Sequence, residues 1–265
     1  MAEPFLPKWI AWEVTQRCNL RCIHCRCGAA QDGGDGIFTL PRARALLDDI
    51  ARFASPTIVL TGGEPLLRDD LPELIAYGAA KGFRMCVATN GTLLDDERCA
   101  QLAAAGVKIV SLSLDGASAA VHDDFRRQPG AFEGALRGIE CLKRRGIPFL
   151  INSSFTQRNL GDVRAAYALA KRLGAAAWYM FCVVPAGRGE DIAAELLTPS
   201  QYRELLEWHL AMERDETEML VRPTCMPQYY RLRAEAEARG EKLAHRSLSF
   251  STGGAKGCVA GQSIA

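Results

Sequence analysis

The sequence has no long hydrophobic run and no excess of charge of either sign. No apolar stretch approaches the roughly 20 residues that cross a bilayer, so we expect no membrane-spanning segment. Lys and Arg total 32 against 31 for Asp and Glu, and this balance argues against a polybasic nucleic-acid binder. Residues 1–14 lack the charged, apolar and small-residue regions of a secretory signal. These absences favour a cytoplasmic protein that binds neither membranes nor nucleic acid.

Cysteine is the residue in surplus, with ten in 265 residues. A chain of this length and ordinary composition buries enough apolar surface to fold without disulfides, which are rare in the cytosol in any case. Four of the cysteines fall on one short segment: Cys18, Cys22, Cys25 and Cys27. Thiols packed so densely are prone to oxidation unless a ligand holds them. Cys86, Cys99 and Cys141 are scattered, and we expect them to be small buried side chains.

Strand-like and helix-like patterns alternate through the first 197 residues. Strands are predicted at 9–14, 57–61, 84–89, 108–114, 148–155 and 177–184. Helices are predicted between them, around 43–53, 71–81, 95–105, 132–142 and 160–173. Thr39 is a candidate N-cap, and Asp70 and Glu73 form a capping-box pattern.

Six such alternations with apolar strands predict an α/β fold, in which a parallel sheet covered by helices curls into a partial (β/α)6 TIM-like barrel. In this architecture the loops after the strands carry the chemistry. After residue 197 two helices are predicted, 199–214 and 228–239, followed by a Gly/Ser-rich stretch. We therefore divide the chain into a barrel, 1–197, and a helical extension, 198–265.

The first chemical motif, C-x3-C-x2-C, directly follows the first predicted strand. The thiolates of Cys18, Cys22 and Cys25 can ligate three irons of a four-iron cluster and leave the fourth iron open to a substrate or cofactor. A zinc site and an unliganded reducing loop are the alternatives. Zinc usually takes paired Cys/His sets from two segments, and no second compact pair follows.

The second motif, Gly62-Gly63-Glu64-Pro65, ends the second predicted strand. Paired glycines let the backbone approach a ligand closely, and a carboxylate can accept from an ammonium, although Gly-Gly alone is more often a turn. Four more polar residues stand at later strand ends, where each fits either a ligand contact or an ordinary turn or strand position. They are Asn90, Ser113, Asp115 and Asn152.

Together the two motifs resemble the radical S-adenosylmethionine (radical SAM) superfamily. The resemblance implies that Cys18, Cys22 and Cys25 hold a [4Fe–4S] cluster whose fourth iron chelates the methionyl amine and carboxylate of S-adenosylmethionine. Reduction then cleaves the sulfonium and releases a 5′-deoxyadenosyl radical. By the same resemblance, residues 62–65 clamp the methionine amino group, and the four strand-end residues contact its carboxylate, the ribose and the adenine. His24 stands where the family carries an aromatic residue.

Longer stretches look like the haem-biosynthesis branch, and most like the S-adenosylmethionine-dependent haem synthases of the alternative, sirohaem-derived pathway. These stretches are 10–15, 58–68, 184–189, 222–231 and 257–261. The resemblance implies a tetrapyrrole substrate, iron-coproporphyrin III, two of whose propionates are oxidatively decarboxylated to vinyl groups, and a low-potential flavodoxin- or ferredoxin-like electron donor. The alternatives are a related haem d1 or sirohaem-pathway enzyme, a peptide-modifying maturase, and an iron–sulfur or haem carrier with a degenerate site.

Cys225 and Cys258 match positions at which this branch builds an auxiliary cluster in a SPASM/twitch-like region, and such a cluster would accept the released electron. Two cysteines cannot hold a four-iron cluster, so we expect either a truncated chain or ligands from elsewhere, with Cys27 the remotest candidate. Cys182 has no assigned role. Gln228 stands where we expect a histidine in the haem synthases.

A tetra-anionic porphyrin requires cations near the barrel mouth. The candidate arginines are Arg126, Arg127, Arg188, Arg222, Arg231 and Arg233. Each of them also fits a solvated surface position. Tyr229 and Tyr230 either stack on the macrocycle or pack within the protein.

Overall fold

The computed structural model describes residues 6–34 and 38–241, and its central element is a curled, parallel sheet. In the described residues the sheet has seven strands, and each pairs with the next along the chain. The strands are β1 (Trp9–Glu13), β2 (Thr57–Thr61), β3 (Arg84–Thr89), β4 (Ile109–Ser113), β5 (Phe149–Phe155), β6 (Ala177–Cys182) and β7 (Leu220–Thr224). The half-barrel expected from the sequence is therefore confirmed, with one strand more than predicted.

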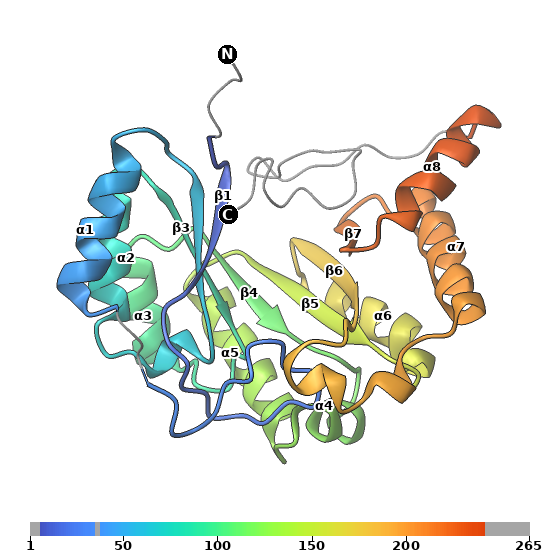
Figure 1. Ribbon diagram of the computed structural model, residues 1–265, viewed down its shortest axis with the longest axis horizontal. Coiled ribbons are helices and arrows are strands. Elements are labelled where there is room, and N and C mark those ends of the chain that lie inside the picture. Colours follow the sequence, from blue (N-terminus) through green and yellow to red (C-terminus); the bar gives the residue numbers. More distant parts are fainter. Residues whose placement is uncertain (1–5, 35–37, 242–265) are drawn as a thin grey trace.

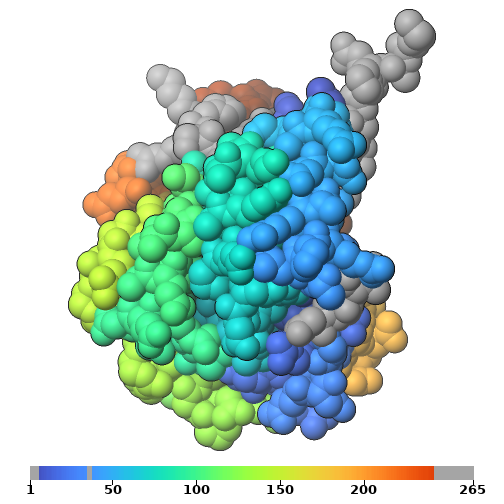
Figure 2. Space-filling view, turned by 90° about the vertical axis from the view of Figure 1, so that its left-hand side faces the viewer, coloured from blue at the N-terminus to red at the C-terminus, as the bar shows by residue number. Residues whose placement is uncertain are grey.

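Helices connect the strands and cover the outer face of the curled sheet (Figure 1). They are α1 (Leu40–Ala51), α2 (Leu71–Ala80), α3 (Asp96–Ala104), α4 (Ala119–Arg126), α5 (Ala131–Arg144), α6 (Val163–Leu173), α7 (Pro199–Asp215) and α8 (Gln228–Ala238). Figure 2 shows α1 and α2 packed side by side over that outer face. Among the described helices, none has the length and apolarity needed to cross a membrane.

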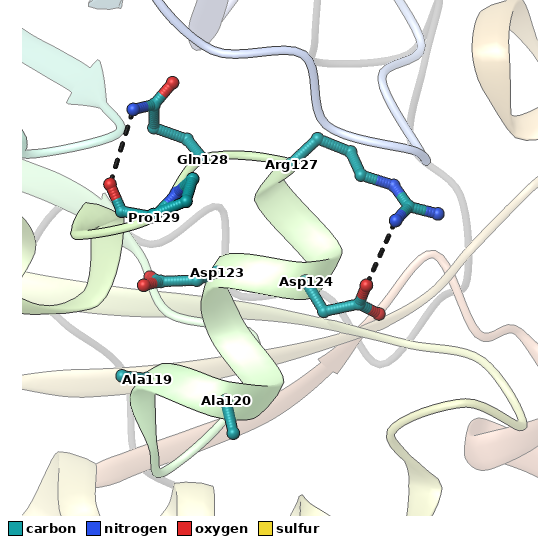
Figure 3. Close-up of a pocket in the computed structure, with 7 residues that line it drawn as sticks. All are labelled: Ala119, Ala120, Asp123, Asp124, Arg127, Gln128 and Pro129. Atoms are coloured by element: carbon teal, nitrogen blue, oxygen red, sulfur yellow. Dashed lines mark hydrogen bonds and ion pairs between the residues drawn. The ribbon is translucent and has the colours of Figure 1, made fainter.

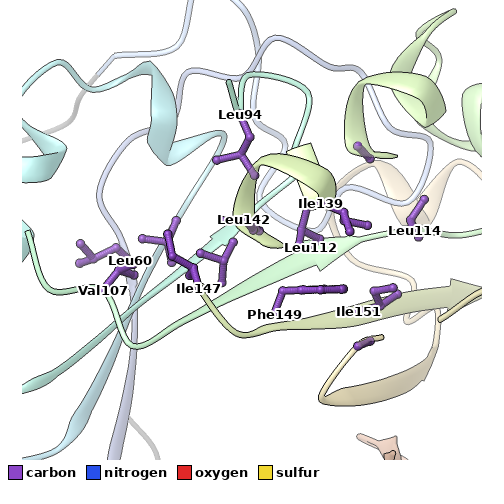
Figure 4. Close-up of a cluster of buried hydrophobic side chains, with 14 of the residues drawn as sticks. Leu60, Leu94, Val107, Leu112, Leu114, Ile139, Leu142, Ile147, Phe149 and Ile151 are labelled. Atoms are coloured by element: carbon purple, nitrogen blue, oxygen red, sulfur yellow. The ribbon is translucent and has the colours of Figure 1, made fainter. Parts of the chain in front are cut away.

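Side chains of the strands alternate between the two faces of the sheet. Those facing outward, such as Leu60, Leu112 and Ile151, pack with Ile139 and Leu142 of α5 in the main core (Figure 4). Those facing inward form a second apolar cluster of Cys86, Ile109, Leu150, Ala177 and Leu220. Burial on both faces explains why the strands read as nearly continuous apolar runs.

The prediction of helices alone after residue 197 is wrong, because β7 lies between α7 and α8. The strand reads Leu-Val-Arg-Pro-Thr and pairs in parallel with β6. Arg222 and Pro223 interrupt its apolar pattern, so the sequence shows no strand period there. Pro223 is tolerated because β7 is the last strand of the described sheet, and an edge strand does not need every N–H for pairing.

Two predicted helix caps differ from the structure. Thr39 stands at the N-cap of α1, but its side chain makes no capping hydrogen bond. Asp70 stands at the N-cap of α2, and its carboxylate binds Arg68 instead, with Nη2–Oδ2 at 2.7 Å and Nε–Oδ1 at 2.8 Å. A bidentate, charge-assisted pair is stronger than a neutral cap bond. Arg68 Nη1 also donates to Val14 O at 2.8 Å, so the pair ties α2 to the end of β1.

Candidate active site

The three predicted cluster cysteines lie together on the loop after β1. Cys18 and Cys22 are buried and Cys25 is partly buried against them. Burial raises the pKa of Cys18 to about 11, and the nearby Glu64 carboxylate and the other two thiols act in the same direction. A metal cation reverses this effect, because a coordinating thiol is deprotonated outright. The loop therefore has the chemistry of a metal-ligand set.

The arrangement of these thiols fits a cluster better than a single ion. Within the described part of the chain, no three His, Cys, Asp or Glu side chains converge as they do around one metal ion. In a four-iron cluster each cysteine binds a different iron, so the thiols stand further apart. Two N–H donors already face the sulfurs, Leu20 N at 3.4 Å from Cys18 Sγ and Arg126 Nη1 at 3.5 Å from Cys22 Sγ. Such N–H···S contacts are typical of iron–sulfur sites.

The segment after β6 holds the cysteine loop in place. Arg188 donates from Nε to Cys22 O at 2.9 Å, from Nη1 to Ala29 O at 2.8 Å and from its backbone N to Cys25 O at 3.0 Å. A Cβ on Gly187 would lie 2.5 Å from Cys25 O, so only glycine permits this approach. The sequence offers Arg188 as a candidate for binding a tetrapyrrole carboxylate. In the structure its guanidinium donates to backbone carbonyls of the cysteine loop.

A buried ion pair supports the loop from the other side. Arg126 Nη2 lies 2.6 Å from Asp115 Oδ2, and both side chains are inaccessible or nearly so. Ser154 N donates to Asp115 Oδ1 at 2.8 Å, which fixes the carboxylate between β4 and β5. Burial is the largest influence and opposes ionisation of Asp115, but Arg126, the two nearby histidines and the Ser154 N–H together outweigh it and lower the pKa. The contact of Asp115 with S-adenosylmethionine stays a prediction, whereas its ion pair with Arg126, which also donates to Cys22 Sγ, is observed.

His24 belongs to the cysteine loop and packs against Phe125 and this ion pair. Its ring lies 4.5 Å from that of Phe125, centroid to centroid, and its Nε2 lies 4.0 Å from Asp115 Oδ2. Burial lowers the pKa of His24 to about 4, so the imidazole is neutral near neutral pH. A neutral, stacked ring occupies the position as an aromatic side chain would.

Gly62 and Gly63 bring the end of β2 against the chain that leads into Cys18. A Cβ on Gly62 would lie 2.3 Å from Thr15 O, and one on Gly63 would lie 2.0 Å from Arg17 O. Gly63 N donates to Thr15 O at 2.8 Å in the same contact. Backbone packing within the protein therefore requires both glycines. The sequence could not show that the contacted segment is Thr15–Arg17.

Alanine at Gly63 is expected to lower the free energy of unfolding by about 1–3 kcal/mol, because its Cβ would overlap a backbone carbonyl. Gly161→Ala is the matched control, since a Cβ there meets no atom within 4 Å. Urea denaturation followed by circular dichroism measures both variants. Equal midpoints for the two would contradict the close approach.

Glu64 is fully buried and ties the end of β2 to the end of β3. Its Oε1 accepts from Thr89 Oγ1 at 2.7 Å and Leu66 N at 3.1 Å, and its Oε2 accepts from Asn90 N at 2.8 Å. Burial raises the pKa of Glu64, and these three hydrogen bonds oppose the rise. Pro65 begins a short 3-10 turn directly after it. The predicted contact between Glu64 and an ammonium group stays a prediction.

The remaining strand-end residues face the inner side of the sheet or the cysteine loop. Asn90 Nδ2 donates to Asn19 Oδ1 at 2.9 Å, which links β3 to the loop. Ser113 and Asn152 are register partners on β4 and β5. Asn152 Nδ2 donates to Ser111 Oγ at 2.8 Å, while its buried Oδ1 has no partner among the described residues. A buried acceptor without a donor costs free energy. Asn152 Oδ1 is therefore suited to accept a hydrogen bond from a bound ligand.

The other cysteines are more dispersed. Cys86, Cys99 and Cys141 are buried, as predicted. Cys225 is exposed after β7, and Cys258 lies outside the described residues, so the auxiliary cluster stays a prediction. Cys27 Sγ lies 3.0 Å from Glu13 Oε1, and Cys182 Sγ lies 3.9 Å from Met226 Sδ.

A surface groove lies on α4 and the turn after it (Figure 3). Its lining is Ala119, Ala120, Asp123, Asp124, Arg127, Gln128 and Pro129. None of the cysteine-loop or strand-end candidates contributes to it. Arg127, one of the candidate arginines, does line it but pairs with Asp124, which also pairs with Arg158. The candidate site is therefore the strand-end region around the cysteine loop.

Comparison with known sequences identifies the family. Residues 12–170 match the family model described as "Radical SAM superfamily". An "AdoMet-dependent heme synthase" of Methanosarcina barkeri is 40% identical over 256 residues, covering 96% of this chain and 72% of the relative. The relative of the same name in Oleidesulfovibrio alaskensis is 41% identical over 253 residues, covering 95% and 65%. The chain thus spans about two thirds of the length of these relatives.

Solved structures share the fold at lower sequence identity. A structure of anSMEcpe with bound AdoMet aligns with a TM-score of 0.70 at 18% identity, covering 90% of this chain and 68% of that one. Streptococcus suis SuiB bound to S-adenosylmethionine aligns at 0.69 and 14% identity, covering 83% and 51%. With the sequence match, the cysteine loop and the half-barrel in agreement, the chain belongs to the radical SAM superfamily of enzymes, in the family of the AdoMet-dependent haem synthases.

Proposed function

We propose that this protein binds a [4Fe–4S] cluster through Cys18, Cys22 and Cys25 and oxidatively decarboxylates propionates of iron-coproporphyrin III to vinyl groups. The observation that carries the proposal is the 40% identity to an "AdoMet-dependent heme synthase" over 96% of the chain. The buried thiol loop with its N–H donors supports it. When bound, the cluster and S-adenosylmethionine would supply a 5′-deoxyadenosyl radical, which takes a hydrogen atom from the propionate β-carbon. CO₂ then leaves as the vinyl group forms, and the released electron would pass to the auxiliary cluster predicted at Cys225 and Cys258.

The chain's own residues place these groups and exclude water. Arg188 fixes the carbonyls of the cysteine loop, and Arg126 donates to Cys22 Sγ. Glu64 holds the ends of β2 and β3 together, beside the loop. The inward-facing apolar cluster closes the bottom of the half-barrel, so that a reactive radical would meet no solvent there. An external low-potential flavodoxin or ferredoxin would supply the reducing electron.

A related tetrapyrrole enzyme of the haem d1 or sirohaem pathway is the second candidate. Gln228 stands where a histidine is expected in the haem synthases, and its Oε1 accepts from Tyr202 OH at 3.1 Å. An amide cannot accept and donate a proton as an imidazole can. Glutamine at position 228 therefore favours a tetrapyrrole reaction other than the decarboxylation by the haem synthases.

Mass spectrometry after anaerobic incubation with iron-coproporphyrin III, reductant and S-adenosylmethionine tests the proposal. We expect products that have lost one and then two carboxyl groups as CO₂, accompanied by 5′-deoxyadenosine. Omission of S-adenosylmethionine serves as the control and should leave the porphyrin intact. Formation of 5′-deoxyadenosine without any vinyl product would reject this substrate and direct the search to the related tetrapyrroles.

A further inference from the structure

The inner face of the half-barrel carries an apolar floor with a polar row directly above it. On the last three strands the floor consists of Leu150, Ala177 and Leu220, which are aligned as register partners. Two residues further along each strand, on the same face, stand Asn152, Tyr179 and Arg222, which are again register partners. Alternation along a strand places residues i and i+2 on one face, so these three side chains form a continuous row.

This row continues the line of predicted cofactor residues. Ser113 pairs with Asn152 across β4 and β5, so the full row runs Ser113, Asn152, Tyr179 and Arg222. Neighbouring strands lie about 4.8 Å apart, which places the backbone of Arg222 roughly 10 Å from that of Asn152. Tyr179 and Arg222 thus lie beside the predicted cofactor position without coinciding with it.

The chemistry of the row is that of an anion site. Its side chains are a hydroxyl, an amide, a phenol and a guanidinium. The charge of Arg222 also opposes the rise in the pKa of the buried Glu213 on α7, whose carboxylate is held by Arg233 at 2.7 Å. Burial raises the pKa of Tyr179 while the charge of Arg222 opposes the rise, so the phenol is a protonated donor at neutral pH. A guanidinium presents parallel N–H groups that match the two oxygens of a carboxylate.

The other five candidate arginines lie outside the strands of the sheet. Arg126 and Arg188 hold the cysteine loop. The remaining three form ion pairs with residues of the outer helices: Arg127 with Asp124, Arg231 with Glu235, and Arg233 with Glu213. Of the six, Arg222 is the one that stands on the inner face of the sheet, by its register with Tyr179.

We propose that Tyr179 and Arg222 form a carboxylate-binding site that receives one propionate of the tetrapyrrole substrate, an inference that rests on the proposed function. The phenol and the guanidinium hold the carboxylate oxygens, and the apolar floor of Leu150 and Ala177 faces the hydrocarbon part of the ligand. The carboxylate held there is next to Ser113 and Asn152, so the propionate chain lies within reach of the cofactor position.

The test compares binding of iron-coproporphyrin III with binding of its tetramethyl ester, which lacks the carboxylates. Both are titrated by absorption spectroscopy against the reconstituted wild-type protein, Arg222→Gln, Arg222→Lys and Tyr179→Phe. Loss of a charged hydrogen bond is expected to weaken binding of the acid by about 10-fold or more in Arg222→Gln, with partial recovery in Arg222→Lys. The matched control is Arg231→Gln, because Arg231 is exposed and paired with Glu235 on its own helix.

The ester separates recognition from folding, since every variant should bind it as the wild type does. Equal acid binding by wild type and Arg222→Gln overturns the site, and so does an equal loss of ester binding. Weakened binding of S-adenosylmethionine with unchanged binding of the porphyrin assigns the pair to the methionyl carboxylate and also overturns it. A wild-type protein that cleaves S-adenosylmethionine but binds neither porphyrin rejects the proposed substrate, and the propionate site with it.

Discussion

Simultaneous replacement of Cys18, Cys22 and Cys25 by alanine is expected to abolish cleavage of S-adenosylmethionine. The three thiols are the ligands that the loop after β1 offers, and they are buried or partly buried in one cluster. Without them Cys27 is the one thiol left on this loop, and a single thiolate cannot hold a four-iron cluster. Anaerobic reconstitution should therefore give a brown wild-type protein and a colourless variant, with 5′-deoxyadenosine measured by chromatography in both.

Cys27→Ala is the control for this experiment, because Cys27 lies on the same loop but is exposed. Its thiol donates to Glu13 Oε1, away from the other three thiols, and it stands outside the C-x3-C-x2-C motif. Iron content and 5′-deoxyadenosine formation should therefore match those of the wild type. Unchanged 5′-deoxyadenosine formation in the triple alanine variant would contradict the ligand assignment.

The parts of the fold that could be predicted are those written in local patterns. Apolar runs of five or six residues located β1 to β6, because both faces of these strands are buried. The Cys18–Cys25 loop follows from spacing alone. β7 was missed because Arg222 and Pro223 break its pattern, and α4 because its eight residues carry too few apolar positions to show a helical period.

The support of the site could not be predicted, because it joins segments far apart in the chain. Arg126 meets Cys22 across 104 positions and Arg188 meets it across 166. The expected approach of Gly62 and Gly63 to a ligand stays a prediction, whereas their close contacts with Thr15 and Arg17 could not be inferred from the motif. Composition and spacing identify residues able to make a close contact, and only the fold identifies the partner. For the same reason the sequence cannot distinguish the six candidate arginines from one another. The register of β6 and β7 is what places Arg222 on the inner face of the sheet.

Methionine in place of Arg126 is expected to cost about 3–5 kcal/mol of folding free energy, the effect of leaving a buried charge without its partner. The Asp115 carboxylate would remain fully buried. Near its oxygens would be only the Ser154 N–H, which donates to Oδ1, and His24 Nε2, which lies 4.0 Å from Oδ2. Urea denaturation under reducing conditions measures the loss. Arg127→Met is the matched control, because Arg127 is half exposed and pairs with Asp124, an interaction worth at most about 1 kcal/mol.

The double variant Asp115→Asn/Arg126→Met distinguishes a lost ion pair from lost packing. Removing both charges leaves no unpaired ion, so the double variant should be more stable than the sum of the single losses predicts, by about 0.5–3 kcal/mol. If the losses simply add, the Asp115–Arg126 pair is not the source of the effect.

Arg126 also donates to Cys22 Sγ. The reconstituted Arg126→Met variant should therefore have a more negative cluster reduction potential, because it lacks a cationic N–H donor to a ligating sulfur. A potential equal to that of the wild type would limit Arg126 to a role in folding, whereas a shift would show that the same buried pair both supports the loop and adjusts the electron affinity of the site.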